Sequence, residues 1–120
     1  MYFGQCLCGQ VSYRVKSEFV EIECCHCLTC RKAHSSAFAM GVTIDSADFE
    51  LQTGQELLKE YESSTGKKRV FCGQCGSHLY AYRVAQPESV RLRPACLNID
   101  MSSFKYSHIY TENCLRIDSE

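Results

Sequence analysis

The chain has no long apolar run, no strong excess of either charge and few prolines. Its 120 residues include 13 Lys and Arg against 14 Asp and Glu, for a formal net charge of -1. That balance argues against a nucleic-acid surface or a polybasic membrane patch. No apolar run approaches the roughly 18 residues of a membrane span, and the N-terminus shows no signal-peptide pattern. With two prolines and 45% hydrophobic residues, we expect one globular cytoplasmic domain over residues 1–120, with no nucleic-acid or membrane partner.

Familiar enzyme motifs are missing as well. The sequence has no glycine-rich phosphate loop and no nucleophile elbow, and its acidic residues are scattered rather than paired. The one basic cluster, Lys67-Lys68-Arg69, is predicted to be a solvated turn rather than a phosphate site. Any chemistry must therefore come from another residue type.

Cysteine is that residue type, because ten cysteines stand in 120 residues. Without a visible signal peptide, such a chain is better interpreted as metal-binding than as disulfide-linked, although a mature secreted fragment would also lack its signal. Seven of the cysteines fall into three short pieces. These are Cys6-Leu7-Cys8-Gly9, Cys25-His26-Cys27-Leu28-Thr29-Cys30 and Cys72-Gly73-Gln74-Cys75-Gly76.

The first and third pieces each predict half of a zinc site. In both, two close thiols precede a glycine, and a tight turn there lets both sulfurs face one ion. Together Cys6, Cys8, Cys72 and Cys75 predict a closed four-thiolate structural zinc, which would help a chain with a modest core. The alternatives are buried free cysteines or, for Cys72 and Cys75, a thioredoxin-type motif.

The middle piece predicts a second zinc bound by Cys25, Cys27 and Cys30. Three thiolates leave a fourth position for water, a substrate or another side chain. The alternatives are an ordinary structural site completed by an internal ligand, or a thioredoxin-type motif, which requires a βαβ context that the pattern lacks. The internal candidates, which otherwise are structural histidines or small buried thiols, are Cys24, His26, His34, Cys96, His108 and Cys114.

Most of the remaining sequence predicts short strands and little helix. Gln10–Val15 alternates apolar and polar residues, and Phe19–Cys24 would deliver Cys25 to a strand end. Cys27–Ala33 favours one helical turn, which would place Cys27 and Cys30 on one face. Further strands are predicted at Ser36–Thr43, Asp48–Gln52, Leu57–Glu62, Lys68–Cys72, Leu79–Val84 and Ser89–Leu92. The pattern therefore indicates an all-β sheet or sandwich.

The order and spacing of the three cysteine pieces resemble the glutathione-dependent formaldehyde-activating enzyme family, which shares its domain with centromere protein V. The resemblance covers nearly the whole chain. It rests on Gly4–Tyr13, Cys25–Lys32, Ser36–Phe38, Asp48–Gly54, Tyr61–Ser64 and Arg69–Leu79. It implies a zinc-stapled Mss4-like fold of small antiparallel sheets. It also implies a structural zinc on the four outer cysteines and an activity-linked zinc, two ions per chain, on the three central ones.

The C-terminal third departs from the family pattern. Pro94–Asn98 stands where the family usually has a glycine, a small residue and Leu-Asp. His108-Ile109 fits the pattern, but Asn113-Cys114 replaces the usual Pro-Trp pair, and the chain has no tryptophan. These departures leave the cysteines intact and concern the substrate pocket.

The resemblance implies a carbon–sulfur lyase that forms or cleaves S-hydroxymethylglutathione or a related thiol adduct. On this hypothesis the thiol of glutathione enters the open zinc position, loses its proton there and attacks formaldehyde. Arg31 and Lys32 follow the central cysteines and are the predicted partners of the two glutathione carboxylates, with a solvated turn as the alternative. Two other functions stay open: a zinc-stabilised binding module without chemistry, and a thiol carrier or metal buffer. The sequence leaves the oligomeric state open. We also expect the second zinc to leave first on chelation, because it is predicted to be the more exposed of the two.

Overall fold

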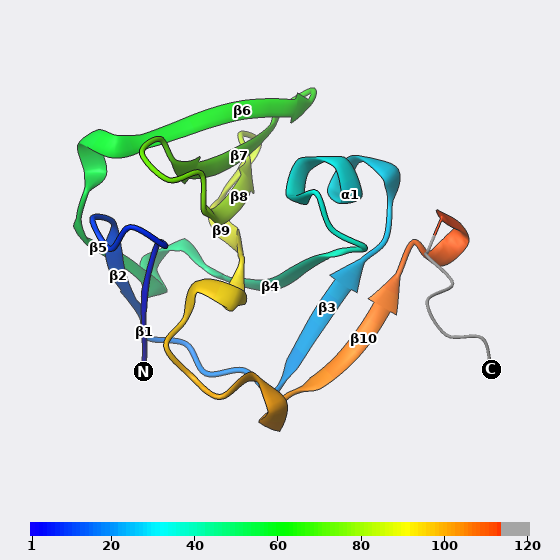
Figure 1. The fold of residues 1–120 in the computed structure, drawn as a ribbon, viewed down its shortest axis with the longest axis horizontal. Helices are drawn as coiled ribbons and strands as arrows, with labels where there is room; N and C mark the ends of the chain where they lie inside the picture. Colours follow the sequence, from blue (N-terminus) through cyan, green and yellow to red (C-terminus); the bar gives the residue numbers. More distant parts are fainter. Residues whose placement is uncertain (114–120) are drawn as a thin grey trace.

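The described part of the chain, residues 1–113 of the computed structural model, folds into two β-sheets and one short α-helix (Figure 1). The smaller sheet has the strand order β1-β2-β5 and the larger one the order β10-β3-β4-β9-β8-β7-β6. The smaller sheet consists of β1 (Tyr2–Gln5), β2 (Ser12–Val15) and β5 (Phe49–Thr53). The larger consists of β3 (Glu21–Cys25), β4 (Ala39–Asp45), β6 (Leu58–Ser64), β7 (Lys67–Cys72), β8 (His78–Arg83), β9 (Gln86–Leu92) and β10 (Lys105–Ile109). The predicted all-β class with little helix is confirmed.

The core draws residues from both sheets. Tyr13, Ile22, Leu79 and Leu92 are the largest fully buried side chains, and the Tyr13 ring also stacks on Phe49 with centroids 4.9 Å apart. Burial alternates along β2 and β8, as strands with one face toward the core require. None of the described helices is long and apolar enough to cross a membrane.

Helix α1 (Leu28–His34) follows β3 directly and lies on the same side of the molecule as β6 and β7 (Figure 1). Its N-cap is Cys27, whose sulfur accepts a hydrogen bond from the Cys30 amide at 3.3 Å. Ser35, in the left-handed region at φ 50°, ends the helix. The predicted helical turn at Cys27–Ala33 is therefore confirmed.

Three features differ from expectation. Strands β1 and β10 were not predicted, and β10 pairs with β3 in parallel, an exception to the antiparallel pattern of the other pairs. The prediction of a solvated turn at Lys67–Arg69 is wrong, because these residues begin β7 and Arg69 is only 3% exposed. A buried arginine in a strand places a charge inside the molecule, where it needs a specific reason to be.

Candidate metal centres and an adjoining cleft

The first cluster unites cysteines that are more than 60 residues apart in the chain. The sulfur atoms of Cys6, Cys8, Cys72 and Cys75 all lie within 4.8 Å of one another. The Sγ atoms of Cys6 and Cys8 are 3.5 Å apart, and those of Cys8 and Cys72 are 4.0 Å apart. Tetrahedral zinc with Zn–S bonds of about 2.3 Å spaces its sulfurs by roughly 3.8 Å. The four sulfurs therefore fit one zinc ion.

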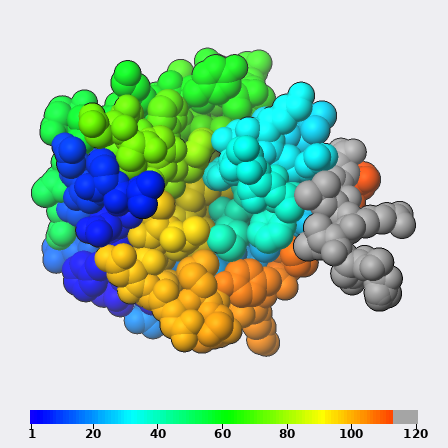
Figure 2. Space-filling view, in the orientation of Figure 1, coloured from blue at the N-terminus to red at the C-terminus, as the bar shows by residue number. Residues whose placement is uncertain are grey.

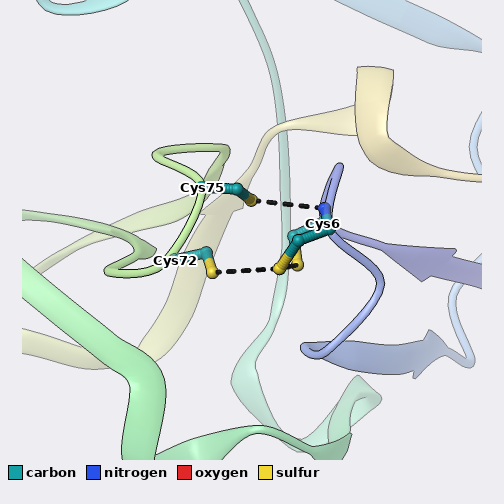
Figure 3. A group of neighbouring side chains, drawn as sticks. Cys6, Cys72 and Cys75 are labelled. Carbon is teal, nitrogen blue, oxygen red and sulfur yellow. Dashed lines mark hydrogen bonds between the residues drawn. The ribbon is translucent and has the colours of Figure 1, made fainter.

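Two similar loops build the first cluster. Cys6 and Cys8 come from the loop between β1 and β2, whereas Cys72 ends β7 and Cys75 lies in the loop that follows it, as Figure 3 shows for three of them. In the space-filling view of Figure 2, the blue N-terminal segment lies against the green segment of the chain. In each loop a glycine amide closes the turn onto the carbonyl of the first cysteine, Gly9 onto Cys6 and Gly76 onto Cys72.

Those closing glycines are required by the backbone. Gly9 and Gly76 have φ values of +81° and +83°, in the region that side chains disfavour. Backbone amides then point at the sulfurs, with Val11 N 3.3 Å from Cys6 Sγ and Gln74 N 3.4 Å from Cys72 Sγ. Such N–H groups favour the thiolate form that binds metal.

Cys75 carries the clearest sign of this preference. Hydrogen bonds from the side chain and backbone of Ser77 lower the pKa of the Cys75 thiol to about 5. The Ser77 hydroxyl lies 3.3 Å from Cys75 Sγ. At neutral pH this thiol is therefore a thiolate, ready to bind a cation.

The second cluster unites Cys25, Cys27 and Cys30 within 4.8 Å. Cys25 is the last residue of β3, Cys27 caps α1 and Cys30 lies in its first turn. Cys25 and Cys30 are buried, and Cys27 is half-buried. The strand end and the helix cap thus turn a short sequence motif into a three-sulfur face that fits one metal ion.

Arg69 lies against this cluster from β7. Its Nη2 donates to Cys30 Sγ at 3.6 Å. Burial alone would raise the pKa of the Cys30 thiol, but the hydrogen bond and charge of Arg69, with hydrogen bonds from Cys25 and Cys27, outweigh burial and lower it.

A cleft of about 280 Å³ opens beside the second cluster and is bordered by Cys25 and Cys30. Its charged lining is mainly basic. The basic side chains are Lys67, Arg83, Arg91 and Arg93. Glu23 is the one acidic residue among its described lining residues, and its carboxylate already pairs with Arg91 at 2.7 Å. The cleft therefore suits an anionic molecule that carries a metal-binding group.

Arg93 is the most deeply placed of these cations. It is 5% exposed, and its Nη1 donates to the Met40 carbonyl at 3.1 Å. Burial lowers the pKa of Arg93 to about 10, so the guanidinium is still charged at neutral pH.

The candidates for an internal fourth ligand lie elsewhere. Within residues 1–113, no other Cys, His, Asp or Glu atom joins the group of Cys25, Cys27 and Cys30. His26 Nε2 and His108 Nδ1 hydrogen-bond each other at 2.7 Å, and the rings of His34 and His78 pack at 4.3 Å. Two other candidates are thiols: Cys24 is buried, and Cys96 donates to the His78 carbonyl at 3.6 Å. The last, Cys114, lies outside the described residues.

The two predicted substrate residues lie on α1. Arg31 and Lys32 stand in its last turn, where positive charge also interacts favourably with the helix C-terminus. Neither is among the residues that line the cleft. The cleft cations instead come from β7, β8 and β9 and from the residue after β9, and sequence analysis missed them because they are scattered along the chain.

Comparison with known proteins shows the family to which the chain belongs. The model of the glutathione-dependent formaldehyde-activating enzyme family matches residues 1–113. The chain belongs to this family. A Schizosaccharomyces pombe protein described as an uncharacterized lyase is 38% identical over 80 residues, covering 66% of this chain and 56% of that protein. The chain thus spans about half the length of this curated relative.

A solved structure is also similar. The crystal structure of a Rhodobacter sphaeroides protein matches with a TM-score of 0.70 and 26% sequence identity. The match covers 88% of this chain and 99% of that one. Most of this chain therefore shares its fold with a solved structure.

Proposed function

We propose that the protein is a zinc-dependent carbon–sulfur lyase that forms or cleaves S-hydroxymethylglutathione or a closely related thiol adduct. One observation carries the proposal: a three-cysteine cluster borders a cleft that presents four basic side chains. Family membership and the lyase description of the yeast relative support the same class of reaction.

The charges of the cleft suit glutathione. Glutathione carries two carboxylates and one ammonium group, and guanidinium groups bind carboxylates through charge-assisted, often bidentate, hydrogen bonds. Arg91 and Arg93 lie close together, since both approach the same Gly41. We propose that Lys67, Arg83, Arg91 and Arg93 bind the carboxylates and so hold the thiol beside Cys25 and Cys30.

The reaction needs no redox cofactor. The thiol sulfur bonds to the carbonyl carbon, the C=O π bond breaks, and the thiol proton ends on the new hydroxyl oxygen. Zinc bound by Cys25, Cys27 and Cys30 would favour the deprotonated form of a thiol at its fourth position, which is the nucleophile this addition requires. The chain's own contribution is to bind the thiol, orient it and exclude water from part of the cleft.

Arg31 and Lys32 stay predicted contacts for the same carboxylates. Their place on α1, next to the cluster, keeps them close to the second metal centre. Steady-state kinetics decide whether the cleft cations or the two residues of α1 bind the carboxylates. Arg91→Met raises the KM for glutathione if the cleft binds it, whereas Lys32→Met raises it if the helix does.

The proposal is tested by exchange NMR on zinc-loaded protein with glutathione and formaldehyde. We expect the protein to accelerate exchange with S-hydroxymethylglutathione, and Cys27→Ser to abolish the acceleration. Cys96→Ser is the matched control, because Cys96 is a partly buried cysteine outside both clusters and a serine hydroxyl can also donate to the His78 carbonyl.

Equal exchange with wild type and Cys27→Ser would rule out the formaldehyde reaction at this centre. If glutathione binds to the wild type without faster exchange, the protein is a thiol carrier. If glutathione neither binds nor exchanges, the domain is a zinc-stabilised binding module.

A further inference from the structure

Arg69 is a buried cation whose role the proposed reaction does not explain. It lies on β7, next to the edge strand of the larger sheet, and pairs with Tyr61 of β6 and Ala81 of β8. It is only 3% exposed. Its Nε donates to Ser63 Oγ at 2.9 Å and its Nη2 to Cys30 Sγ at 3.6 Å, while Nη1 is buried without a partner among the described residues.

Within residues 1–113, no carboxylate forms an ion pair with this charge. Burying a guanidinium without a counter-charge is costly, because the hydrogen bonds to Ser63 and Cys30 replace only part of its lost hydration. The partner that can carry negative charge is the sulfur of Cys30, so the arginine is balanced when the cluster is in its thiolate form.

The net charge of a metal-loaded second cluster explains the contact between Arg69 and Cys30. Three thiolates around a divalent cation leave one negative charge, and an anionic sulfur in the fourth position makes two. In a partly buried site such accumulation is strongly unfavourable. A fixed positive charge beside Cys30 offsets one of these charges.

We propose that Arg69 is the counter-charge of the second cluster, a positioning residue that lets the cluster accept an anionic sulfur as its fourth ligand. The identity of that ligand as a thiol rests on the proposed function. Arg69 itself is held in place by Ser63 and by its strand neighbours, so it acts through Cys30 and need not touch the substrate.

Cobalt-substituted protein tests the proposal by ligand binding rather than turnover. Two probes are titrated and followed by the ligand-field and sulfur-to-cobalt absorption bands. 2-Mercaptoethanol binds as an anion and has no carboxylate for the cleft to recognise, whereas imidazole binds as a neutral ligand. The four-cysteine cluster has no free position and contributes a constant background.

We expect Arg69→Met to weaken 2-mercaptoethanol binding at least tenfold and to leave imidazole binding within twofold. Arg69→Lys keeps the charge and should recover most of the loss, and Lys68→Met, a neighbouring cation outside the contact, should behave as wild type. Selective loss of the anionic ligand is a readout that a purely structural role would not give.

Three results would overturn the proposal: unchanged 2-mercaptoethanol binding in Arg69→Met, equal weakening of both probes, or no binding of either probe to the wild type. Failure of the proposed function looks different. In that case 2-mercaptoethanol and imidazole bind as described, but glutathione binds no better than 2-mercaptoethanol and formaldehyde exchange is not accelerated.

Discussion

At the scale of single residues, Gly41 determines where two cleft arginines lie. A Cβ built on Gly41 would clash with Arg91 Nε and stand 3.0 Å from Arg93 Nη1. Gly41→Ala must therefore displace at least one guanidinium. We expect glutathione binding to weaken roughly tenfold, the size of one lost charge-assisted hydrogen bond. Isothermal titration of zinc-loaded protein measures it.

The fold should tolerate this change, because Arg91 is a flexible side chain and can move aside. We expect the free energy of unfolding to fall by no more than about 1 kcal/mol. Arg91→Met should reproduce the loss of binding. Unaltered glutathione affinity in Gly41→Ala would show that the cleft arginines do not bind the thiol's carboxylates.

His34 gives the stability of the protein a pH dependence. Burial, followed by the positive charges of Arg93 and other neighbours, lowers the pKa of His34 to about 3 from the usual 6.5. The neutral ring is therefore favoured in the fold. Its contribution is fully present above about pH 6.5 and is lost as the pH falls toward 3.

His34→Gln removes this titration. We expect the free energy of unfolding of the wild type to fall more steeply between pH 7 and pH 5 than that of the variant, as measured by urea denaturation. Acid also releases metal from thiolates, so metal content is measured in both proteins at each pH. Lys32→Gln, an exposed change on the same helix, is the control, and parallel curves for wild type and His34→Gln would contradict the assignment.

The residues of the candidate site differ in how far the sequence reveals them. The three cysteine pieces stand out in the sequence because the cysteines within each are only two to five positions apart, a spacing that local turns enforce. Lys67 and Arg93 face one cleft only because β7 and the end of β9 belong to one sheet. No local sequence pattern predicts that these two side chains share a cleft. In the sequence alone, Arg69 resembles an ordinary surface cation, and only the structure shows that it is buried.

At the scale of elements, the sequence patterns predicted several strands close to their observed bounds. Leu57–Glu62 was expected and β6 spans Leu58–Ser64, and Lys68–Cys72 was expected where β7 spans Lys67–Cys72. Strand β10, at the other edge of the larger sheet, was not predicted. Its parallel pairing with β3 joins segments about 80 residues apart, which tertiary structure decides and periodicity does not.

Helix α1 is the element that depends most on the second metal centre. Seven residues are too few for a stable isolated helix, and both its N-cap and its first turn supply cysteines. We expect mild chelation to remove the second metal first and to expose the amides of residues 28–34 to hydrogen exchange before those of β7 and β8.

The sequence analysis attributed the early loss of the second metal to greater exposure, and the structure gives a different reason. Cys8 of the first cluster is exposed, whereas the second cluster has no exposed cysteine, so exposure does not favour early loss there. Ligand number does, because three protein sulfurs hold an ion less firmly than four. Metal analysis that shows both ions leaving in a single step would contradict this order.

At the scale of the whole molecule, β7 connects the two centres. Cys72 at its end belongs to the first cluster, and Arg69, three residues earlier, contacts the second. The first cluster also ties the N-terminal sheet to the larger sheet by joining Cys8 to Cys72, which are 64 positions apart. The second closes only the short segment from Cys25 to Cys30.

This contrast predicts opposite consequences for losing each centre. A cross-link that closes a long segment restricts the unfolded chain more than one that closes a short segment. We expect Cys8→Ser, which alters an exposed side chain and leaves no core cavity, to lose one zinc and to lower the Tm by roughly 10 °C or more. Cys27→Ser should also lose one zinc but change the Tm by only about 3 °C while abolishing thiol exchange. Calorimetry with metal counting checks both variants, and equal Tm losses would mean that the second centre, too, holds the fold together.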